Sequence, residues 1–256
     1  MFVTTVYNPS AELEIRSRQL AVAMNSQWVS RSNRSLNKIR NLYGDEPILV
    51  LTGKELKYYH HGEMALFFHP GTAVIRIKRL ISGVSDPLVH ASGMLPGDTV
   101  LDCTAGMASD SIVFSYVSGA EGRVVALESE PILYLLVHQG LACYTSEISS
   151  INDAMRRIKL IKMPHLAYLK NLKDASFDII YFDPMFRRPI EESSAIAPVR
   201  EIANHSPLCL EAVTEARRVA RKKVIMKEHR DSDQFIKLGF AKQFRANSQV
   251  AYGVIE

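Results

Sequence analysis

The tetrapeptide Asp183-Pro184-Met185-Phe186 contains residue types suited to chemistry on a planar amine. It follows the apolar run Phe177–Phe182, whose composition predicts a buried strand. An exocyclic amine shares its nitrogen lone pair with its ring, so its reaction needs acceptors that hold the two N–H groups. The Asp183 carboxylate and the Pro184 carbonyl are such acceptors, and Phe186 can stack on a base. Positioning and electrostatics suffice for this chemistry, without a metal or a covalent nucleophile.

Two earlier segments carry residues suited to holding a nucleoside. Gly106 lies in the turn after the strand-like run Thr99–Cys103, where it permits close backbone approach at a helix start that favours anions. Glu128 ends the strand-like run Arg123–Leu127, and a carboxylate at such a strand end can accept both hydroxyls of an adenosine ribose. The alternatives are an ordinary loop at Gly106 and a solvated helix-start residue at Glu128.

These residues need a parallel sheet to bring them to one edge. From Asp98 onward, apolar strand-like runs alternate with helical stretches, which predicts a doubly wound α/β fold. Asp183 then ends the fourth strand, 81 residues after Asp102, and this placement favours its chemical role over a plain Asp-Pro turn. Lys227 ends the fifth strand and is expected to be solvated, with contact to a phosphate or to substrate as the alternative. The expected strands are 99–103, 123–127, 158–163, 177–182 and 222–227, and the expected helices are 109–117, 131–143, 148–157, 165–172 and 207–220.

The chain ends differently, with strand-like runs at 240–246 and 249–255 that only Asn247-Ser248 separates, so we expect an antiparallel hairpin. A parallel αβ series closed by a hairpin is the layout of class I methyltransferases. The fold class predicted is therefore a doubly wound, mostly parallel, seven-stranded sheet with a small N-terminal α+β domain.

The first part of the chain has a different pattern and carries all of the excess positive charge. Residues 1–97 hold 11 Lys or Arg against 7 Asp or Glu, whereas the remainder holds 20 of each. Helices are expected at 10–24 and 35–43, followed by short β-rich runs at 47–51, 56–59, 65–68 and 72–80 and a joining segment at 82–97. We therefore predict a domain over residues 1–82 and a larger one over 83–256. RNA contact is one interpretation of the aromatic and basic residues of the first domain, and a solvated surface is the other; the residues are Trp28, Arg31, Arg34, Lys38 and Arg40.

Several classes of protein are disfavoured by composition. No apolar stretch approaches the roughly 20 residues that a membrane helix needs, and no signal peptide is evident. The three cysteines are scattered, which predicts neither a disulfide framework nor a zinc site. We expect a cytoplasmic protein without metal, and the sequence leaves its oligomeric state open.

Four segments together resemble the bacterial small-subunit rRNA guanine-N2 methyltransferases, a family that uses S-adenosylmethionine. They are residues 102–110 (DCTAGMASD), 127–128 (LE), 181–186 (YFDPMF) and 216–227 (ARRVARKKVIMK), and the similarity covers roughly residues 70–256. The resemblance implies cofactor contacts from the strand-end residues. The predicted cofactor site comprises Asp102, Thr104, Gly106, Ser109, Asp110, Glu128, Ser129, Pro164, His165 and Asp183.

The chain departs from that family at several positions. Ala108 stands where the family has glycine, Ser109 where it has arginine, and Pro164-His165 where it has small polar residues. Residues 1–69 match poorly, and the segment after Phe186 lacks the family's lysine-rich run. The leading hypothesis is methylation of an exocyclic amine of a nucleic-acid base, guanine N2 of rRNA first. The alternatives are an adenine-N6 or small-molecule amine methyltransferase, and a non-catalytic RNA-binding protein on this fold.

Overall fold

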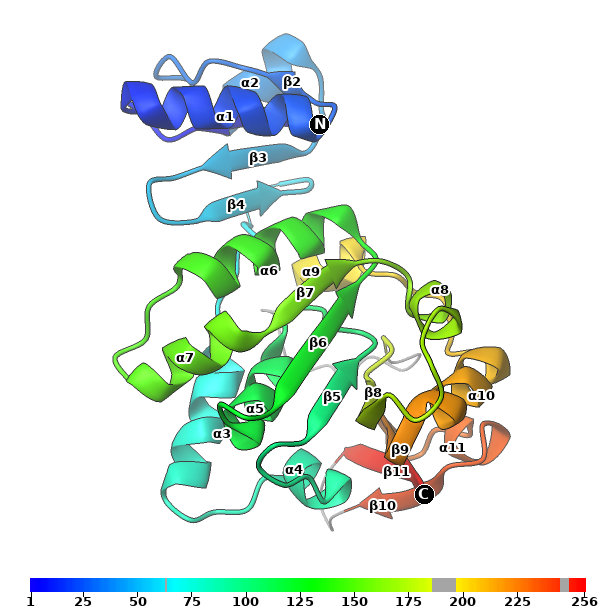
Figure 1. Cartoon of the computed structure of the whole chain (residues 1–256). Helices are drawn as coiled ribbons and strands as arrows, with labels where there is room; N and C mark the ends of the chain where they lie inside the picture. Colours follow the sequence, from blue (N-terminus) through cyan, green and yellow to red (C-terminus); the bar gives the residue numbers. More distant parts are fainter. Residues whose placement is uncertain (63, 186–196, 245–248) are drawn as a thin grey trace. The chain divides into compact units, whose positions relative to one another are not determined.

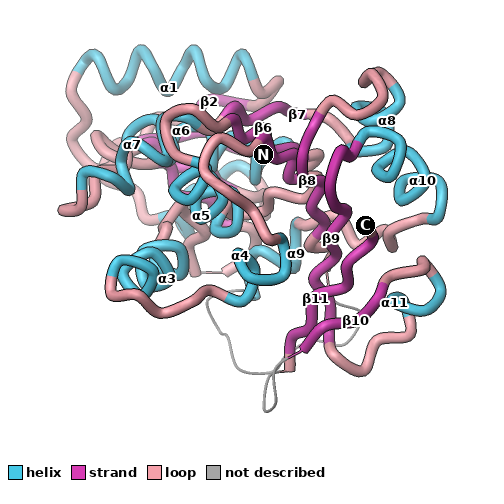
Figure 2. The backbone as a smooth tube through the Cα atoms, turned by 60° about the horizontal axis from the view of Figure 1, so that its bottom comes forward, coloured by secondary structure: helices cyan, strands magenta, loops and turns pink. Residues whose placement is uncertain are grey.

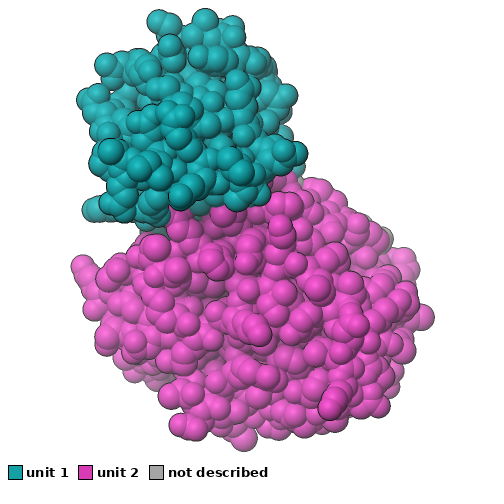
Figure 3. Space-filling model, turned by 45° about the horizontal axis from the view of Figure 1, so that its top comes forward, with its two compact units in different colours: residues 1–69, 195–201 teal, residues 70–194, 202–256 magenta. Residues whose placement is uncertain are grey.

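The computed structural model describes residues 1–62, 64–185, 197–244 and 249–256, and it divides into two compact units (Figure 3). The first unit comprises Met1–His69 together with most of helix α9 (Ala197–Ile202). The second begins at Pro70 and contains the rest of the chain. The division thus falls earlier than the predicted boundary between residues 82 and 83, because the helix after Pro70 packs into the second unit.

The first unit is a four-stranded sheet with a helix after each of its first two strands. Its strand order is β2-β1-β3-β4, in which β1 is parallel to both β2 and β3 while β4 is antiparallel to β3. Ser10 and Ser35 cap the two helices through their side chains. The elements are β1 (Phe2–Thr5), α1 (Ala11–Ala23), β2 (Gln27–Trp28), α2 (Leu36–Tyr43), β3 (Ile48–Leu51) and β4 (Leu56–Tyr59).

This arrangement corrects the expectation of two helices followed by four β-rich runs in the first domain. Strands β1 and β2 were not foreseen, and they make most of the sheet parallel. The β-rich run at 65–68 contributes only a single bridge, from Leu66 to Tyr58. A two-residue strand such as β2 leaves too short a pattern to recognise from sequence.

The strand expected at 72–80 is wrong, because this segment forms helix α3 (Gly71–Ile81). Its alternation of β-branched and basic residues suggested a strand, but the buried residues are Ala73 and Ile77, which lie one helical turn apart. The predicted joining segment likewise contains a helix, α4 (Pro87–Ser92), which Asp86 caps through the backbone N–H groups of Leu88 and Val89.

The second unit is built on a seven-stranded sheet of order β10-β11-β9-β8-β5-β6-β7 (Figures 1 and 2). Strands β5 to β9 are mutually parallel, and β10 and β11 form the antiparallel hairpin that the sequence predicted. The strands are β5 (Thr99–Asp102), β6 (Arg123–Glu128), β7 (Lys159–Lys162), β8 (Phe177–Phe182), β9 (Ala220–His229), β10 (Ala241–Phe244) and β11 (Val250–Ile255). The remaining helices are α5 (Ser109–Ser118), α6 (Pro131–Cys143), α7 (Ser149–Arg157), α8 (His165–Lys170), α10 (Leu210–Val219) and α11 (Gln234–Lys237).

Helices cover both faces of this sheet because its central strands are apolar on both sides. Leu101 and Ile180 pack in one buried cluster with Ala212 of α10, and α8 packs beside α10. Their neighbours Val100 and Ile179 are equally buried and point to the opposite face, where α5 packs with α3 and α7. This sandwich fixes the carboxyl ends of β5, β6, β8 and β9 at one edge. No helix in the described part of the chain has the length and apolar character to cross a bilayer.

Candidate active site

The loop between β5 and α5 is held in shape by Asp102. This side chain is 1% exposed, and its carboxylate accepts hydrogen bonds from the Thr104 backbone N–H at 3.1 Å and from the Ser111 hydroxyl at 2.5 Å. Burial raises the pKa of Asp102 to about 7. Ala108, just before α5, has φ +60°, the left-handed region where the resembling family has glycine. Asp102 therefore shapes the loop from within.

Glu128 ties the end of β6 to the same loop. Its carboxylate accepts the Gly106 N–H at 3.0 Å and the Glu130 N–H at 2.8 Å, and burial raises its pKa. Gly106 has φ +50°, and a Cβ built on it would meet no heavy atom within 4 Å. The loop is thus anchored on one side by a carboxylate and bordered by open space beside Gly106.

Asp183 lies at the end of β8 within reach of the loop and of β9. Its backbone N–H donates to the Thr104 hydroxyl at 2.5 Å, and its Oδ2 accepts from Lys227 Nζ at 2.7 Å. Oδ1 has no hydrogen-bond partner among the described residues. Burial raises the pKa of Asp183 to about 6, against the opposing effect of the Lys227 ammonium. Among the described residues, therefore, only one of the two carboxylate oxygens is held by a side chain.

Asp110 is the centre of a buried ionic network beneath Asp183. Its carboxylate accepts from Tyr181 Oη at 2.7 Å and from Lys227 Nζ at 3.1 Å, and it forms a further ion pair with Arg76. Although burial opposes ionisation, Lys227 and Arg76 hold the pKa of Asp110 well below its usual range. The network therefore joins α5, β8, β9 and α3 with an ionised carboxylate at its middle.

Sequence reasoning gave Lys227 and Arg76 too little weight. Lys227 bridges two carboxylates rather than standing in solvent, and its side chain is 22% exposed. Arg76 holds Asp86 with two hydrogen bonds of 2.8 and 2.9 Å as well as Asp110. The available signal was a cation directly after the apolar run 224–226, because a charged side chain that is largely buried within a strand requires a charge partner.

The other predicted site residues lie around the same edge with fewer contacts. Ser109 begins α5 and Ser129 follows β6, both half-buried. Pro164 is exposed immediately before α8. The ring of His165 packs edge-on against Phe182 at 5.5 Å between centroids, and burial lowers its pKa. The predicted stacking residue Phe186 lies outside the described residues.

The predicted basic surface of the first unit is largely engaged in internal contacts. The Arg18 guanidinium stacks 3.6 Å from the centroid of the Trp28 ring, and the indole N–H donates to Ser17 at 2.8 Å. Arg40 is buried and donates to the Gly62 carbonyl at 3.0 Å. These contacts leave Trp28 and Arg40 little freedom to bind a ligand.

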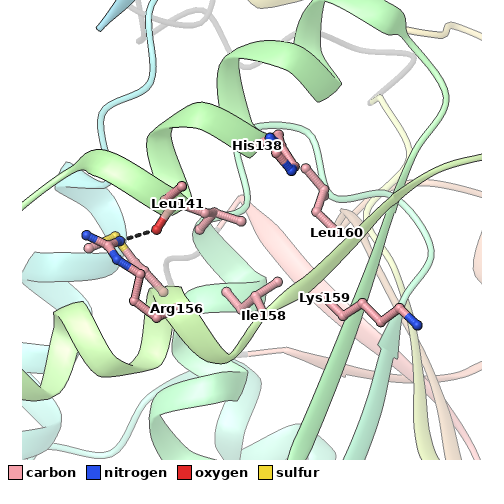
Figure 4. Close-up of a pocket in the computed structure, with 8 residues that line it drawn as sticks. His138, Leu141, Arg156, Ile158, Lys159 and Leu160 are labelled. Atoms are coloured by element: carbon pink, nitrogen blue, oxygen red, sulfur yellow. Dashed lines mark hydrogen bonds between the residues drawn. The ribbon is translucent and has the colours of Figure 1, made fainter. Parts of the chain in front are cut away.

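A pocket of about 320 Å³ lies away from this edge, between α6, α7 and the start of β7 (Figure 4). His138, Ile158 and Lys159 line it, and none of the predicted site residues does. Its Arg156 donates to the Leu141 and Tyr144 carbonyls and so caps the end of α6. Within the described ranges, no group of three or more His, Cys, Asp or Glu residues could hold a metal ion.

The fold matches that of a SAM-dependent methyltransferase from Neisseria gonorrhoeae. The two structures agree with a TM-score of 0.65 over 99% of this chain and 95% of that one, at 18% sequence identity. Taken with the strand order and the closing hairpin, this match defines the class: the protein has the class I S-adenosylmethionine-dependent methyltransferase fold.

The family follows from sequence. Residues 37–237 match the family described as "Putative SAM-dependent methyltransferase". The YpiP protein of Bacillus subtilis is 38% identical over 255 residues, which cover 99% of this chain and 98% of that protein. The chain therefore belongs to this family of methyltransferases, and S-adenosylmethionine is its cofactor.

More distant relatives carry a substrate in their name. A ribosomal RNA small subunit methyltransferase J from Actinobacillus succinogenes is 32% identical over 134 residues, half of each chain. The protein of that name from Psychrobacter cryohalolentis is 26% identical over 208 residues, which cover 77% of this chain and 67% of that relative.

Proposed function

We propose that this methyltransferase acts on an exocyclic amine of a nucleic-acid base, with guanine N2 of small-subunit rRNA as the first candidate. The observation that carries the proposal is the Asp183-Pro184 pair at the end of β8, where one carboxylate oxygen is fixed by Lys227 and the other has no partner among the described residues. The names of the relatives supply the choice of rRNA.

The reacting amine would be held by this chain's own acceptors. Asp183 Oδ1 and the Pro184 carbonyl would accept its two N–H groups, which fixes the direction of the nitrogen. The amine loses one proton as it gains the methyl group, and the Asp183 carboxylate is the acceptor nearest to it. Burial favours this role because a raised pKa makes a carboxylate a stronger base.

The residues at the sheet edge fit the cofactor. Glu128 would accept the ribose hydroxyls, and the open space beside Gly106 would admit the methionine part. The other predicted cofactor residues, Ser129 and His165 among them, border the same edge. When bound, S-adenosylmethionine supplies an electrophilic methyl group. Thr104 would position the reaction by holding the Asp183 backbone N–H at 2.5 Å.

The proposal is tested with S-adenosylhomocysteine binding and methyl transfer measured side by side. Replacing Asp183 with alanine is expected to abolish transfer to small-subunit rRNA while calorimetry still detects binding of S-adenosylhomocysteine. Asp174→Ala is the matched control, since this carboxylate is 77% exposed and pairs with Arg218 at the surface. A rate of methyl transfer in Asp183→Ala equal to that of the wild type would refute the role assigned to Asp183.

A second prediction concerns pH. Because a protonated carboxyl cannot accept the amine N–H, methyl transfer is expected to fall as the pH drops through about 6, the pKa of Asp183. Initial rates between pH 5 and 8 at saturating cofactor check this, and a rate independent of pH across that range would contradict it.

A further inference from the structure

We propose that the first unit binds a phosphate group beside Arg31, in the loop of residues 29–35 that joins β2 to α2. The proposal concerns a different part of the chain from the methyl-transfer site and does not depend on it. The ligand chemistry is a phosphate monoester or diester, with an RNA backbone and a free nucleotide as its two sources.

The topology of the first unit creates a ligand edge. Its three parallel strands have the order β2-β1-β3, so the chain leaves the central strand β1 first to one side and then crosses to the other. In open parallel sheets, ligands bind beyond the carboxyl ends of the strands where the strand order reverses. The order reverses between β1 and β3, so the segment 6–10 after β1 borders this point, and the loop 29–35 follows the neighbouring strand β2 at the same carboxyl edge.

Arg31 is buried at this edge, and no acidic side chain among the described residues pairs with it. Its side chain is among the buried charged groups at 9% exposure, and its Nε and Nη1 have no hydrogen-bond partner in the described part of the chain. Its guanidinium carbon lies 4.4 Å from the centroid of the Tyr7 ring, a cation–π contact that accepts none of its N–H groups. A buried charge without a partner is costly, and an anion would supply the missing acceptors.

The surrounding charge favours an anion. Between Glu14 and Asp45 the chain carries six basic residues and no acidic one. The hydroxyls of Ser30 and Ser32 lie 2.8 Å apart in the same loop. The N-terminal turn of α2 likewise has no acidic side chain. The first turn of α1 does carry acidic residues, which places the site on the α2 side.

A phosphate group matches these donors. Guanidinium groups bind phosphate through several N–H donors at once, and serine hydroxyls and helix-start N–H groups are its usual further partners. The half-exposed Tyr7 ring over Arg31 is the side chain that would shift to admit the group.

The test observes the Arg31 Nε–H directly in the full chain labelled with ¹⁵N, with its resonance assigned by its loss in Arg31→Met. Inorganic phosphate, uridine 5′-monophosphate and a short single-stranded RNA are titrated at constant ionic strength, with chloride and uridine as blanks. A shift of this resonance with phosphate-bearing probes only is expected. The absence of such a shift with all three probes would overturn the proposal.

The two sources are separated by affinity. An RNA-backbone site binds the oligonucleotide more tightly than uridine 5′-monophosphate, whereas a nucleotide site shows the reverse order. Arg31→Met is expected to raise the dissociation constant of the preferred probe about tenfold. Arg16→Met, which removes an exposed charge from α1, is expected to change that constant by no more than about twofold. Equal losses in both variants would mean general charge attraction and would refute the site. If Arg31→Met fails to fold, the conservative Arg31→Lys, which also lacks an Nε–H, supplies the assignment, and the titration of the wild-type resonance decides.

Discussion

Replacing Lys227 with methionine removes the ammonium group that joins the carboxylates of Asp110 and Asp183 at the carboxyl edge of the second unit's sheet. Lys227 Nζ lies 2.7 Å from Asp183 Oδ2 and 3.1 Å from Asp110 Oδ2. Removing one partner of a buried ion pair costs roughly 3–5 kcal/mol, because the other charge stays buried. The Lys227 and Asp183 side chains retain 22% and 26% exposure, so we expect the lower end, about 3 kcal/mol. A loss of that size lowers Tm by roughly 6–12 °C in a protein of this length.

The cost in Lys227→Met should grow with pH. Burial already raises the pKa of Asp183 to about 6, and removing the ammonium raises it further. A carboxyl whose pKa is higher in the folded than in the unfolded state stabilises the fold at low pH, and this contribution is lost as the pH rises through the folded pKa. In the wild type this loss is complete soon above pH 6. In Lys227→Met it continues to higher pH, because the pKa of Asp183 in the folded variant is higher. For each unit by which the pKa of Asp183 is higher in the variant, the free energy of unfolding falls by about 1.4 kcal/mol more than in the wild type between pH 6 and 8.

Urea unfolding at pH 6, 7 and 8 measures both effects. Circular dichroism is the appropriate signal because the single tryptophan, Trp28, lies in the first unit. Lys223→Met is the matched control on the same strand, since Lys223 is similarly exposed but pairs with Glu256 at the surface, a pair worth at most about 1 kcal/mol. Equal urea midpoints for the two variants would refute the stabilising role of the Lys227 ion pairs. So would a difference in unfolding free energy between wild type and Lys227→Met that stays constant from pH 6 to 8.

Three further predictions concern the loop between β5 and α5 and the residues that hold it. Glu128→Ala should weaken S-adenosylhomocysteine binding by on the order of tenfold in calorimetry, with Glu130→Ala as the control, because two backbone N–H groups lose their acceptor. Thr104→Val should lower kcat for methyl transfer more than it lowers cofactor affinity, since the Asp183 N–H loses its partner; equal effects on both would contradict this. Ala108→Gly should raise stability in urea by about 0.5–1 kcal/mol by relieving a left-handed φ of +60°, and a loss of stability would count against the strain.

The second unit was predictable because its signals are local. Each parallel strand is a short apolar run between helical stretches, and the Asn247-Ser248 pair between two strand-like runs indicated the hairpin. The strand ends at Asp102, Glu128 and Asp183 meet at one edge simply because parallel strands end together. The sequence periodicity therefore carried most of this unit's architecture.

The errors arise where long-range contacts decide the structure. Residues 72–80 alternate as a strand would, yet Arg76 is drawn into an ion pair with Asp110, 34 residues away, and the segment is a helix. Lys227 looked solvated because its two carboxylate partners are 44 and 117 residues distant in the chain. Contacts of this kind leave no periodic signal in the sequence.

The most direct test of the central claim is the nucleoside composition of small-subunit rRNA from a strain that lacks this gene. We expect N2-methylguanosine to be depleted there, to return with the wild-type gene and to stay depleted with Asp183→Ala. An unchanged nucleoside profile, or restoration by Asp183→Ala, would contradict the proposed reaction at Asp183-Pro184.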